Sequence, residues 1–218
     1  MTSILFRVPS AGGRSACAAA AIAVLSAIGA CSSPPSPAFD LTAPRQRVTG
    51  GGGVGGQIVV AEPTALQPYE SERIVVKDAA GSISFLGGAQ WSDRLPRLLQ
   101  AKIIQTFENA SRIRAVGRPG DGSTGDYQLT TELRSFQLDT AAGQTVVEIS
   151  AKLINLTGGR IVAARVFAAR VPVGSANPGE VTQGLDRALS TVLIDIVRWA
   201  GTSRQSPAPL ASSAPPLR

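Results

Sequence analysis

The chain has 218 residues, of which 44% are hydrophobic and 17% charged, with 21 basic and 15 acidic side chains, two cysteines and no histidine. Without histidine there can be no Ser-His-Asp or Cys-His triad and no HExxH zinc site, which excludes the commonest hydrolase designs. Two cysteines cannot form an all-cysteine zinc site or a dense disulfide framework. The net charge of +6 is compatible with an anionic partner but does not identify one.

The N-terminus has the composition of a secretory signal peptide. Arg7 and Arg14 are the only charged residues before residue 31, and residues 15–30 are uncharged and rich in Ala, Ile, Val and Leu. This apolar stretch is shorter than the roughly 20 residues that span a bilayer. A basic start, a short apolar segment and small residues at its end are typical of a cleaved leader. We therefore predict a signal peptide over residues 1–30.

The residues that end the leader, Ile28, Gly29, Ala30 and Cys31, resemble the lipobox of bacterial lipoproteins. In those proteins the Cys sulfur takes a diacylglyceryl group, the chain is cleaved before the Cys, and the new amine is acylated. The alternatives are an ordinary signal peptide with a chance cysteine, or a buried thiol. The lipobox is favoured because residues 31–56, rich in Pro and Ser and then in Gly, have the composition of a flexible tether. Several acyl chains on one residue hold a protein firmly at a membrane.

Processing would change both location and charge. Ser32, not Asp, follows Cys31, which in sorted lipoproteins implies export, so we predict a lipid-anchored protein of the outer membrane that faces the periplasm. Loss of two arginines leaves 21 − 2 = 19 basic side chains and a net charge of 19 − 15 = +4. Cys17 is lost with the leader, so the mature chain has no disulfide. The lower charge weakens the case for nucleic acid, and we expect none as a partner.

Residues 57–200 carry the patterns of one folded domain, whereas residues 201–218, rich in Pro, Ser and Ala, are predicted to form a disordered tail. The clearest elements are three long strands with alternating apolar residues, joined by short turns, which cover residues 127–138, 147–153 and 161–173. The alternation slips by one residue at Ser135, which predicts a β-bulge. Shorter strands are predicted over residues 57–61, 73–77 and 82–86.

Two amphipathic helices complete the domain. The first follows Asp93, has Pro96 in its first turn, and places apolar residues at three- and four-residue spacing up to Phe107. The second begins at Asn177-Pro178 and carries an apolar stripe that ends at Trp199. Each helix has one apolar face to bury. The predicted fold is therefore α+β, with a mainly antiparallel sheet and both long helices packed on one face.

Six segments of the domain resemble, in order, the auxiliary lipoproteins of ABC-type lipid transport systems: ISFLGGAQW, LPRLLQAKIIQTFE, YQLTTELRSFQLD, TVVEISAKLINL, GGRIVAARVFAARVPV and LDRALSTVLIDIVRW. The resemblance covers nearly all of residues 57–199. Its recurrent features are Trp91 before the first helix, the Leu95-Pro96 pair, the strand end at Phe136–Asp139 and the Gly159–Val162 strand. It carries no catalytic signature, and the Gly run before the first strand departs from the family pattern.

This resemblance implies a docking role in a system that moves phospholipids or other hydrophobic molecules across the envelope. The implied partners are an MCE-domain protein and an ABC permease with its ATPase, and the family analogy allows a homo-oligomer. Energy would come from that ATPase, because this chain has no P-loop. No enzymatic activity, cofactor or metal is expected. The alternative is a structural or assembly lipoprotein of the outer membrane, which needs the same anchor, tether and domain.

Beyond the lipidation site at Cys31, four side chains are candidates for contact with a partner or with lipid: Trp91, Arg94, Arg97 and Lys102. The tryptophan could gate a lipid groove, although large aromatics at the edges of amphipathic helices are more often core anchors. The basic residues could meet anionic head groups or an acidic partner. A solvated helix face explains them equally well. The acidic residues converge with no nucleophile, so no catalytic site is predicted.

Overall fold

A three-stranded antiparallel meander forms the centre of the fold. The structure, a computed structural model, describes residues 36–46, 56–110, 116–122 and 125–203. The meander consists of β7 (Tyr127–Asp139), β8 (Gln144–Asn155) and β9 (Arg160–Pro172). The register of β7 against β8 shifts between Leu133 and Ser135, which confirms the predicted bulge.

Shorter strands complete the sheet on the other side of β7. The strands β2 (Ile58–Val60), β3 (Thr64–Ala65) and β4 (Arg73–Lys77) pair with it one after another, all in parallel. The strand β5 (Ile83–Trp91) is antiparallel to β4. Two further strands pair in parallel at the margins: β1 (Ala38–Phe39) with β5, and β6 (Val116–Gly117) with β2.

The expectation of a mainly antiparallel sheet is wrong, because the sheet is mixed. Among the described residues, five of the eight strand pairings are parallel, although the three antiparallel ones include the longest strands. The reason lies in the path of the chain. The segment from β2 to β4 runs in one direction, and the chain returns through β5 and the first helix before β7 starts in that same direction.

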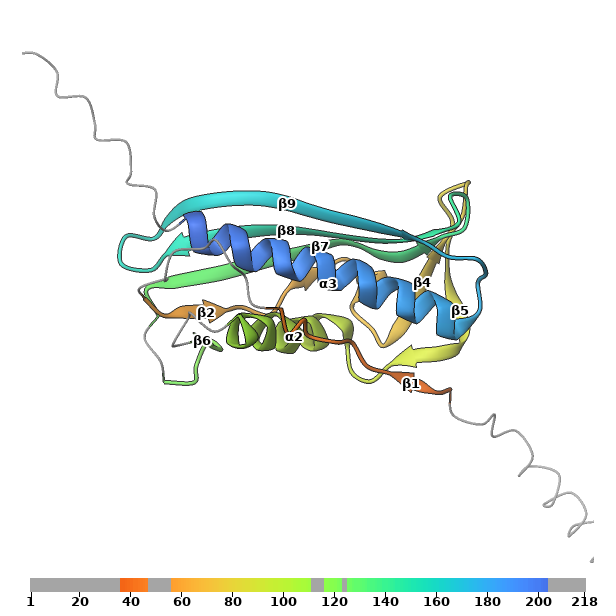
Figure 1. Cartoon of the computed structure of the whole chain (residues 1–218), viewed down its shortest axis with the longest axis horizontal. Coiled ribbons are helices and arrows are strands. Elements are labelled where there is room, and N and C mark those ends of the chain that lie inside the picture. Colours follow the sequence, from red (N-terminus) through yellow and green to blue (C-terminus); the bar gives the residue numbers. More distant parts are fainter. Residues whose placement is uncertain (1–35, 47–55, 111–115, 123–124, 204–218) are drawn as a thin grey trace, which may run out of the picture. The chain divides into compact units, whose positions relative to one another are not determined.

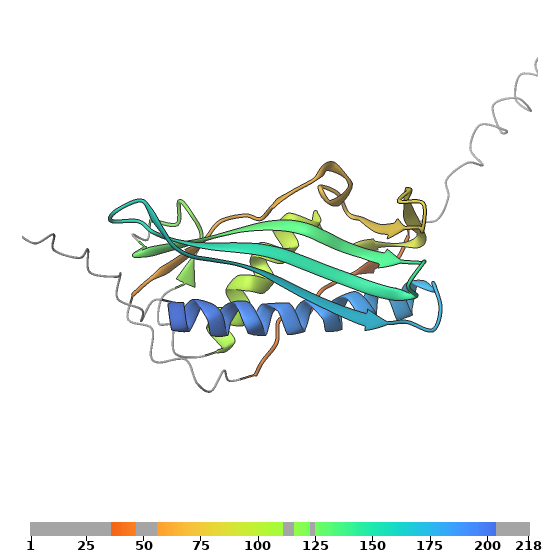
Figure 2. The ribbon, with the colours of Figure 1, turned by 90° about the horizontal axis from the view of Figure 1, so that it is seen from above.

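Two helices lie on the same side of the meander (Figure 1, Figure 2). They are α2 (Leu95–Asn109) and α3 (Pro178–Ser203), and a short 3₁₀ turn, η2 (Gln67–Tyr69), precedes β4. As predicted, α3 starts after Asn177, whose Oδ1 accepts the Glu180 N–H at 2.9 Å. No helix within the described ranges is both long and apolar enough to cross a bilayer.

One core lies between the helices and the sheet. Its fully buried large side chains come from both helices, from β7 and from the N-terminal strands, and include Trp91, Phe107, Phe136, Ile58, Ile74, Leu95, Leu99, Ile103, Leu129, Leu133, Leu185, Leu189 and Ile196. This packing explains the apolar spacing in α2 and α3, since each helix buries the stripe that the sequence displays.

The predicted ends of the domain require two corrections. The helix α3 continues to Ser203, three residues into the predicted tail, and Gly201 is buried in its last turn. Residues 36–46, predicted to be tether, instead pack on the domain, where Leu41 is only 2% exposed. The predicted signal peptide 1–30, the remaining tether residues 31–35 and 47–55, and residues 204–218 lie outside the described residues.

A glycine in α3 allows the helix to approach β8 closely. A Cβ at Gly184 would lie 2.9 Å from Thr145 Oγ1 and 2.9 Å from Val173 Cγ1. We expect Gly184→Ala to lower the free energy of unfolding by about 1–3 kcal/mol, because this overlap exceeds the gain in helix propensity. Gly179→Ala is the matched control, since its nearest neighbour, Asn177 Oδ1, is 3.7 Å away. Equal urea midpoints for the two variants would contradict the close approach.

Candidate functional site

The structure places Trp91 in the core and not on a lipid-accessible surface. Its side chain ends β5, is 1% exposed, and meets the Phe136 ring edge-on with centroids 5.6 Å apart. Its Nε1 is buried and has no hydrogen-bond partner among the described residues. Trp91 is therefore a core anchor, the alternative to the lipid gate, because a side chain that is 1% exposed cannot gate a surface groove.

Arg94 and Arg97 make ion pairs within the domain. Arg94 Nη2 lies 2.5 Å from Glu62 Oε1, and Arg94 Nη1 lies 3.7 Å from Glu70 Oε2. The hydrogen bond that Arg94 donates to Glu62, together with the negative charge of that carboxylate, raises the pKa of Arg94. Arg97 pairs with Asp93 one helical turn away, with Nε 3.3 Å from Oδ2. Both arginines are at least half exposed, but acidic neighbours already compensate their charges.

Lys102 lies on α2, where it holds the N-terminal segment against the domain and is not part of an open basic face. Its ammonium lies 2.9 Å from Asp40 Oδ2, and its side chain is only 11% exposed. The same segment is held at Thr42, whose N–H donates to Asp186 Oδ1 at 2.6 Å, and at Pro44, whose carbonyl accepts from Asn109 at 3.0 Å. The segment 36–46, the N-terminal strap, therefore joins α2 to α3. Within the domain the Lys102 ammonium is therefore paired with Asp40, and the proposed contact of Lys102 with lipid or a partner stays a prediction.

The Asp40–Lys102 pair should make the strap acid-sensitive. Partial burial raises the pKa of Asp40, but hydrogen bonds from Lys102 and from the Leu41 N–H, with the Lys102 charge, outweigh it and lower the pKa overall. A lowered folded-state pKa contributes stability above the unfolded value near 3.9, and this contribution is lost as pH falls through the folded pKa. We expect Asp40→Asn to cost up to about 1 kcal/mol at neutral pH and progressively less below about pH 4. Urea titrations across this range would contradict the account if the difference stayed constant.

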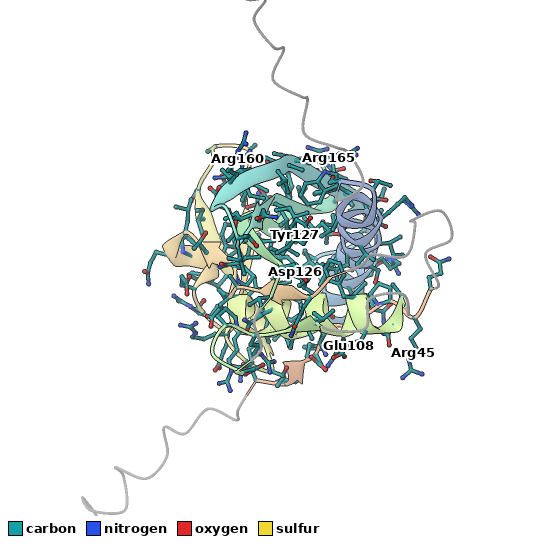
Figure 3. The ribbon with its side chains drawn as sticks, turned by 90° about the vertical axis from the view of Figure 1, so that its left-hand side faces the viewer. Arg45, Glu108, Asp126, Tyr127, Arg160 and Arg165 are labelled. Atoms are coloured by element: carbon teal, nitrogen blue, oxygen red, sulfur yellow. The ribbon has the colours of Figure 1, made fainter. Side chains whose placement is uncertain are left out.

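Strand β9 carries three basic side chains that have no ion-pair partner among the described residues. Arg160, Arg165 and Arg170 are all exposed, and within the described part of the chain none of them forms an ion pair. Figure 3 shows Arg160 and Arg165 on the β9 side of the domain, opposite Arg45 and Glu108 beside α2. The strand itself contains no acidic residue. It is therefore a basic strip along one side of the sheet.

The same strand also exposes apolar side chains. Ile161 is 59% exposed, Val162 44% and Val166 45%. Phe167 is the buried residue of the strand, and its ring meets the Trp199 ring at 5.5 Å. The Arg165 guanidinium lies 5.3 Å from the centre of the same ring. Strand β9 thus carries exposed β-branched and cationic side chains, and the Phe167–Trp199 contact holds it against α3.

Strand β9 is also an edge of the sheet. It pairs with β8 from Arg160–Asn155 to Pro172–Gln144, and no described strand pairs with its other side. An edge strand presents a row of backbone N–H and C=O groups that can accept another strand. We define the exposed edge of β9, residues 160–172, as the β9 edge. The β9 edge thus combines backbone groups that no described strand pairs with exposed arginine side chains.

Sequence reasoning found β9 as a strand but missed its position at the edge. The available signal is the adjacent apolar pair Ile161 and Val162, with an arginine at every fifth position from Arg160. In a strand with one buried face, apolar and polar side chains alternate, whereas this strand has apolar side chains on both faces. Cys31, the predicted lipidation site, lies outside the described residues. No group of three or more acidic or Cys side chains within the described ranges could hold a metal.

Comparison with solved structures supports the fold. A crystal structure of a Xanthomonas campestris protein superposes with a TM-score of 0.72 at 27% sequence identity, covering 78% of this chain and 97% of that one. A second crystal structure, of an uncharacterised protein, gives a TM-score of 0.60 at 12% identity, covering 77% and 99% of the two chains. At that lower identity the likeness concerns the fold alone.

Sequence comparisons identify the family. An uncharacterised protein of Bradyrhizobium diazoefficiens is 29% identical over 166 residues, which is 74% of this chain and 44% of that protein. The chain thus spans less than half the length of this relative. The family described as ABC-type transport auxiliary lipoprotein component matches residues 39–197, from β1 into the last helix. The chain therefore belongs to the family of ABC-type transport auxiliary lipoprotein components.

Proposed function

We propose that this protein is the lipid-anchored docking component of an ABC transporter of the MCE type, which moves phospholipids or other hydrophobic molecules across the envelope. Cys31 carries the lipid in the outer membrane, the domain faces the periplasm, and the β9 edge binds a protein of the transport complex. The observation that carries the proposal is the β9 edge in a member of this family: its three arginines have no ion-pair partner among the described residues, and three of its β-branched residues are exposed.

Charge indicates what kind of segment the β9 edge accepts. The arginines at 160, 165 and 170 are evenly spaced. If the β9 edges of two copies of the chain paired antiparallel about Arg165, Arg160 of each copy would lie opposite Arg170 of the other. Like charges directly opposite each other destabilise a strand pair. An extended segment with acidic side chains, from the MCE-domain protein or the permease, is the better complement. A homo-oligomer, also proposed by analogy, would form through another surface.

Co-purification tests the proposed function. The full-length lipoprotein, extracted from membranes in mild detergent after cross-linking, is expected to bring down an MCE-domain protein or an ABC permease with its ATPase. Recovery of neither, from membranes in which the lipoprotein is intact, would contradict the transport role. That result would favour the alternative, a structural or assembly lipoprotein. A permease, an ATPase and an MCE gene beside the coding gene would support the transport role independently.

Charge reversal on the β9 edge is expected to weaken this association. Arg160→Glu, Arg165→Glu and Arg170→Glu together replace attraction with repulsion, and a change of even about 3 kcal/mol would weaken the affinity for the partner more than a hundredfold and so reduce its recovery. Arg97→Glu is the matched control, because its side chain is 70% exposed but lies on α2. Both variants should keep the wild-type circular dichroism. Equal recovery of the partner with both variants would contradict the proposal that the β9 edge binds it.

A further inference from the structure

The link between the lipid anchor and the folded domain is short. The N-terminal strap begins at Ser36, and Ala38 and Phe39 already pair with Gln90 and Trp91 of β5. Only residues 32–35 separate Cys31 from the strap. Five Cα–Cα steps extend to about 17 Å at most. The 26-residue tether expected from composition would have allowed the domain to lie much farther from the lipid than this link can reach.

The link joins the domain at one particular end. The Gln90 N–H donates to the Pro37 carbonyl at 3.1 Å, so Ser36 lies beside the preceding residues of β5. There a Cβ on Gly88 would lie 4.0 Å from Pro178, the first residue of α3. Figure 1 shows β1, the β4–β5 hairpin and the start of α3 at the same end of the long axis, with β1 on the lower side of that end and the hairpin turn on its upper side, and the β8–β9 turn at the other end.

This end carries side chains suited to a lipid surface. Ile83 is 47% exposed, and the Arg73 guanidinium lies 3.6 Å from the centre of the partly exposed Phe85 ring. Arg73 and Lys77 are exposed and form no ion pair within the described part of the chain. Apolar side chains enter the head-group boundary, and cationic ones bind lipid phosphates.

We propose that the β4–β5 hairpin rests on the phospholipid head groups of the membrane that holds the lipid of Cys31. This inference depends on the proposed lipidation. The short link limits the distance between the membrane and this end of the domain. Ile83 and Phe85 provide apolar contact with the lipid surface, and Arg73 and Lys77 bind the lipid phosphates.

The opposite end then points away from the bilayer. Ile83 lies beside Lys77, which pairs with Asp139, at one end of β7, whereas Ile161 pairs with Ile154, opposite Gln128, at the other. The 11 steps from Gln128 to Asp139 correspond to about 36 Å of strand. The β9 edge therefore extends from the membrane surface into the periplasm, where a partner can reach it.

Site-specific fluorescence quenching tests this orientation. Ile83→Cys and Ile161→Cys, each labelled with the fluorophore NBD in the otherwise full-length lipoprotein, report the two ends, because lipidation occupies Cys31 and leader cleavage removes Cys17. The proteins are reconstituted into vesicles of phosphatidylethanolamine and phosphatidylglycerol that contain head-group spin-labelled lipid. Strong quenching at position 83 and background quenching at position 161 are expected. Equal quenching at both positions, or stronger quenching at 161, would overturn the proposal.

Two further measurements test whether the short link and the lipid on Cys31 cause the quenching at position 83. A Gly/Ser insertion of about 20 residues between Ser33 and Ser36 lengthens the link and is expected to reduce quenching at position 83 severalfold. Unchanged quenching would overturn the role of the short link. Mass spectrometry of the same preparations separates this inference from the proposed function. An unmodified Cys31 overturns both, whereas a lipidated protein without preferential quenching at 83 overturns the orientation alone.

Discussion

Replacement of Cys31 by Ser is expected to remove nearly all of the mature protein from the membrane fraction. The change eliminates the sulfur that carries the diacylglyceryl group, and each buried methylene of such a chain contributes about 0.8 kcal/mol to membrane binding. The domain should still fold, because its contacts begin at the N-terminal strap and not at the cysteine. Fractionation and circular dichroism of the Cys31→Ser protein measure the two expectations separately.

The control for this experiment is Cys17→Ser. Cys17 lies within the predicted leader, so its loss should change neither processing nor the distribution between fractions. Membrane retention of a processed Cys31→Ser protein would contradict the anchor. Retention of an unprocessed protein would not, since an uncleaved apolar leader can itself hold the chain at the membrane.

Truncation of Trp91 is expected to cause the largest loss of stability from a single core substitution. Its side chain is 1% exposed and packs edge-on against Phe136, so Trp91→Ala should lower the free energy of unfolding by about 3–5 kcal/mol. Trp91→Phe should cost less, because it keeps an aromatic ring and removes a buried Nε1–H that has no partner among the described residues. Urea denaturation of the soluble Cys31→Ser protein gives both values.

Trp199→Ala provides the comparison. Trp199 is only partly buried and contacts Phe167 beneath the β9 edge, so its loss should cost less than that of Trp91. A Trp91→Ala protein of wild-type stability that fails to support lipid transport would contradict the core assignment. That result would instead support a direct contact of Trp91 with lipid or a partner.

The sequence pattern predicted those features of the fold that depend on residues close to one another in the chain. The one-residue slip at Ser135 identified the bulge in β7, because alternation in a strand reports directly which side chains face the core. The start of α3 followed from Asn177 and Pro178, a capping residue and a residue suited to the first helical turn. Both signals lie within a few residues of the structure that they specify.

The sequence did not show the N-terminal strap, because its contacts are distant along the chain. The Thr42 N–H donates a hydrogen bond to Asp186, 144 residues away, and Asp40 accepts one from Lys102, 62 residues away. These distant partners hold a segment that has the composition of a linker. Leu41 is the one large apolar side chain that the strap buries fully. A single apolar residue among prolines and polar residues has no periodicity from which burial could be inferred.

The candidate site was missed for a related reason. Helical spacing placed Arg94 and Lys102 on the outside of α2, but Glu62 and Asp40, which neutralise them, come from other elements. Conversely, the arginines of β9 remain free because no acidic residue follows or opposes them at ion-pair distance within the described ranges. Which charges stay uncompensated depends on the tertiary arrangement, and so does the position of a strand at the edge of a sheet.

Site-specific photo-cross-linking from the β9 edge tests the central claim most directly. A photoreactive amino acid at Val166, which is 45% exposed, would be activated in intact cells, and the cross-linked proteins would be identified by mass spectrometry. The same residue at Glu108 on α2 is the control. The account predicts an MCE-domain protein or an ABC permease cross-linked from position 166 and not from position 108. Cross-links to neither partner from position 166, in a protein shown to be lipidated and folded, would contradict it.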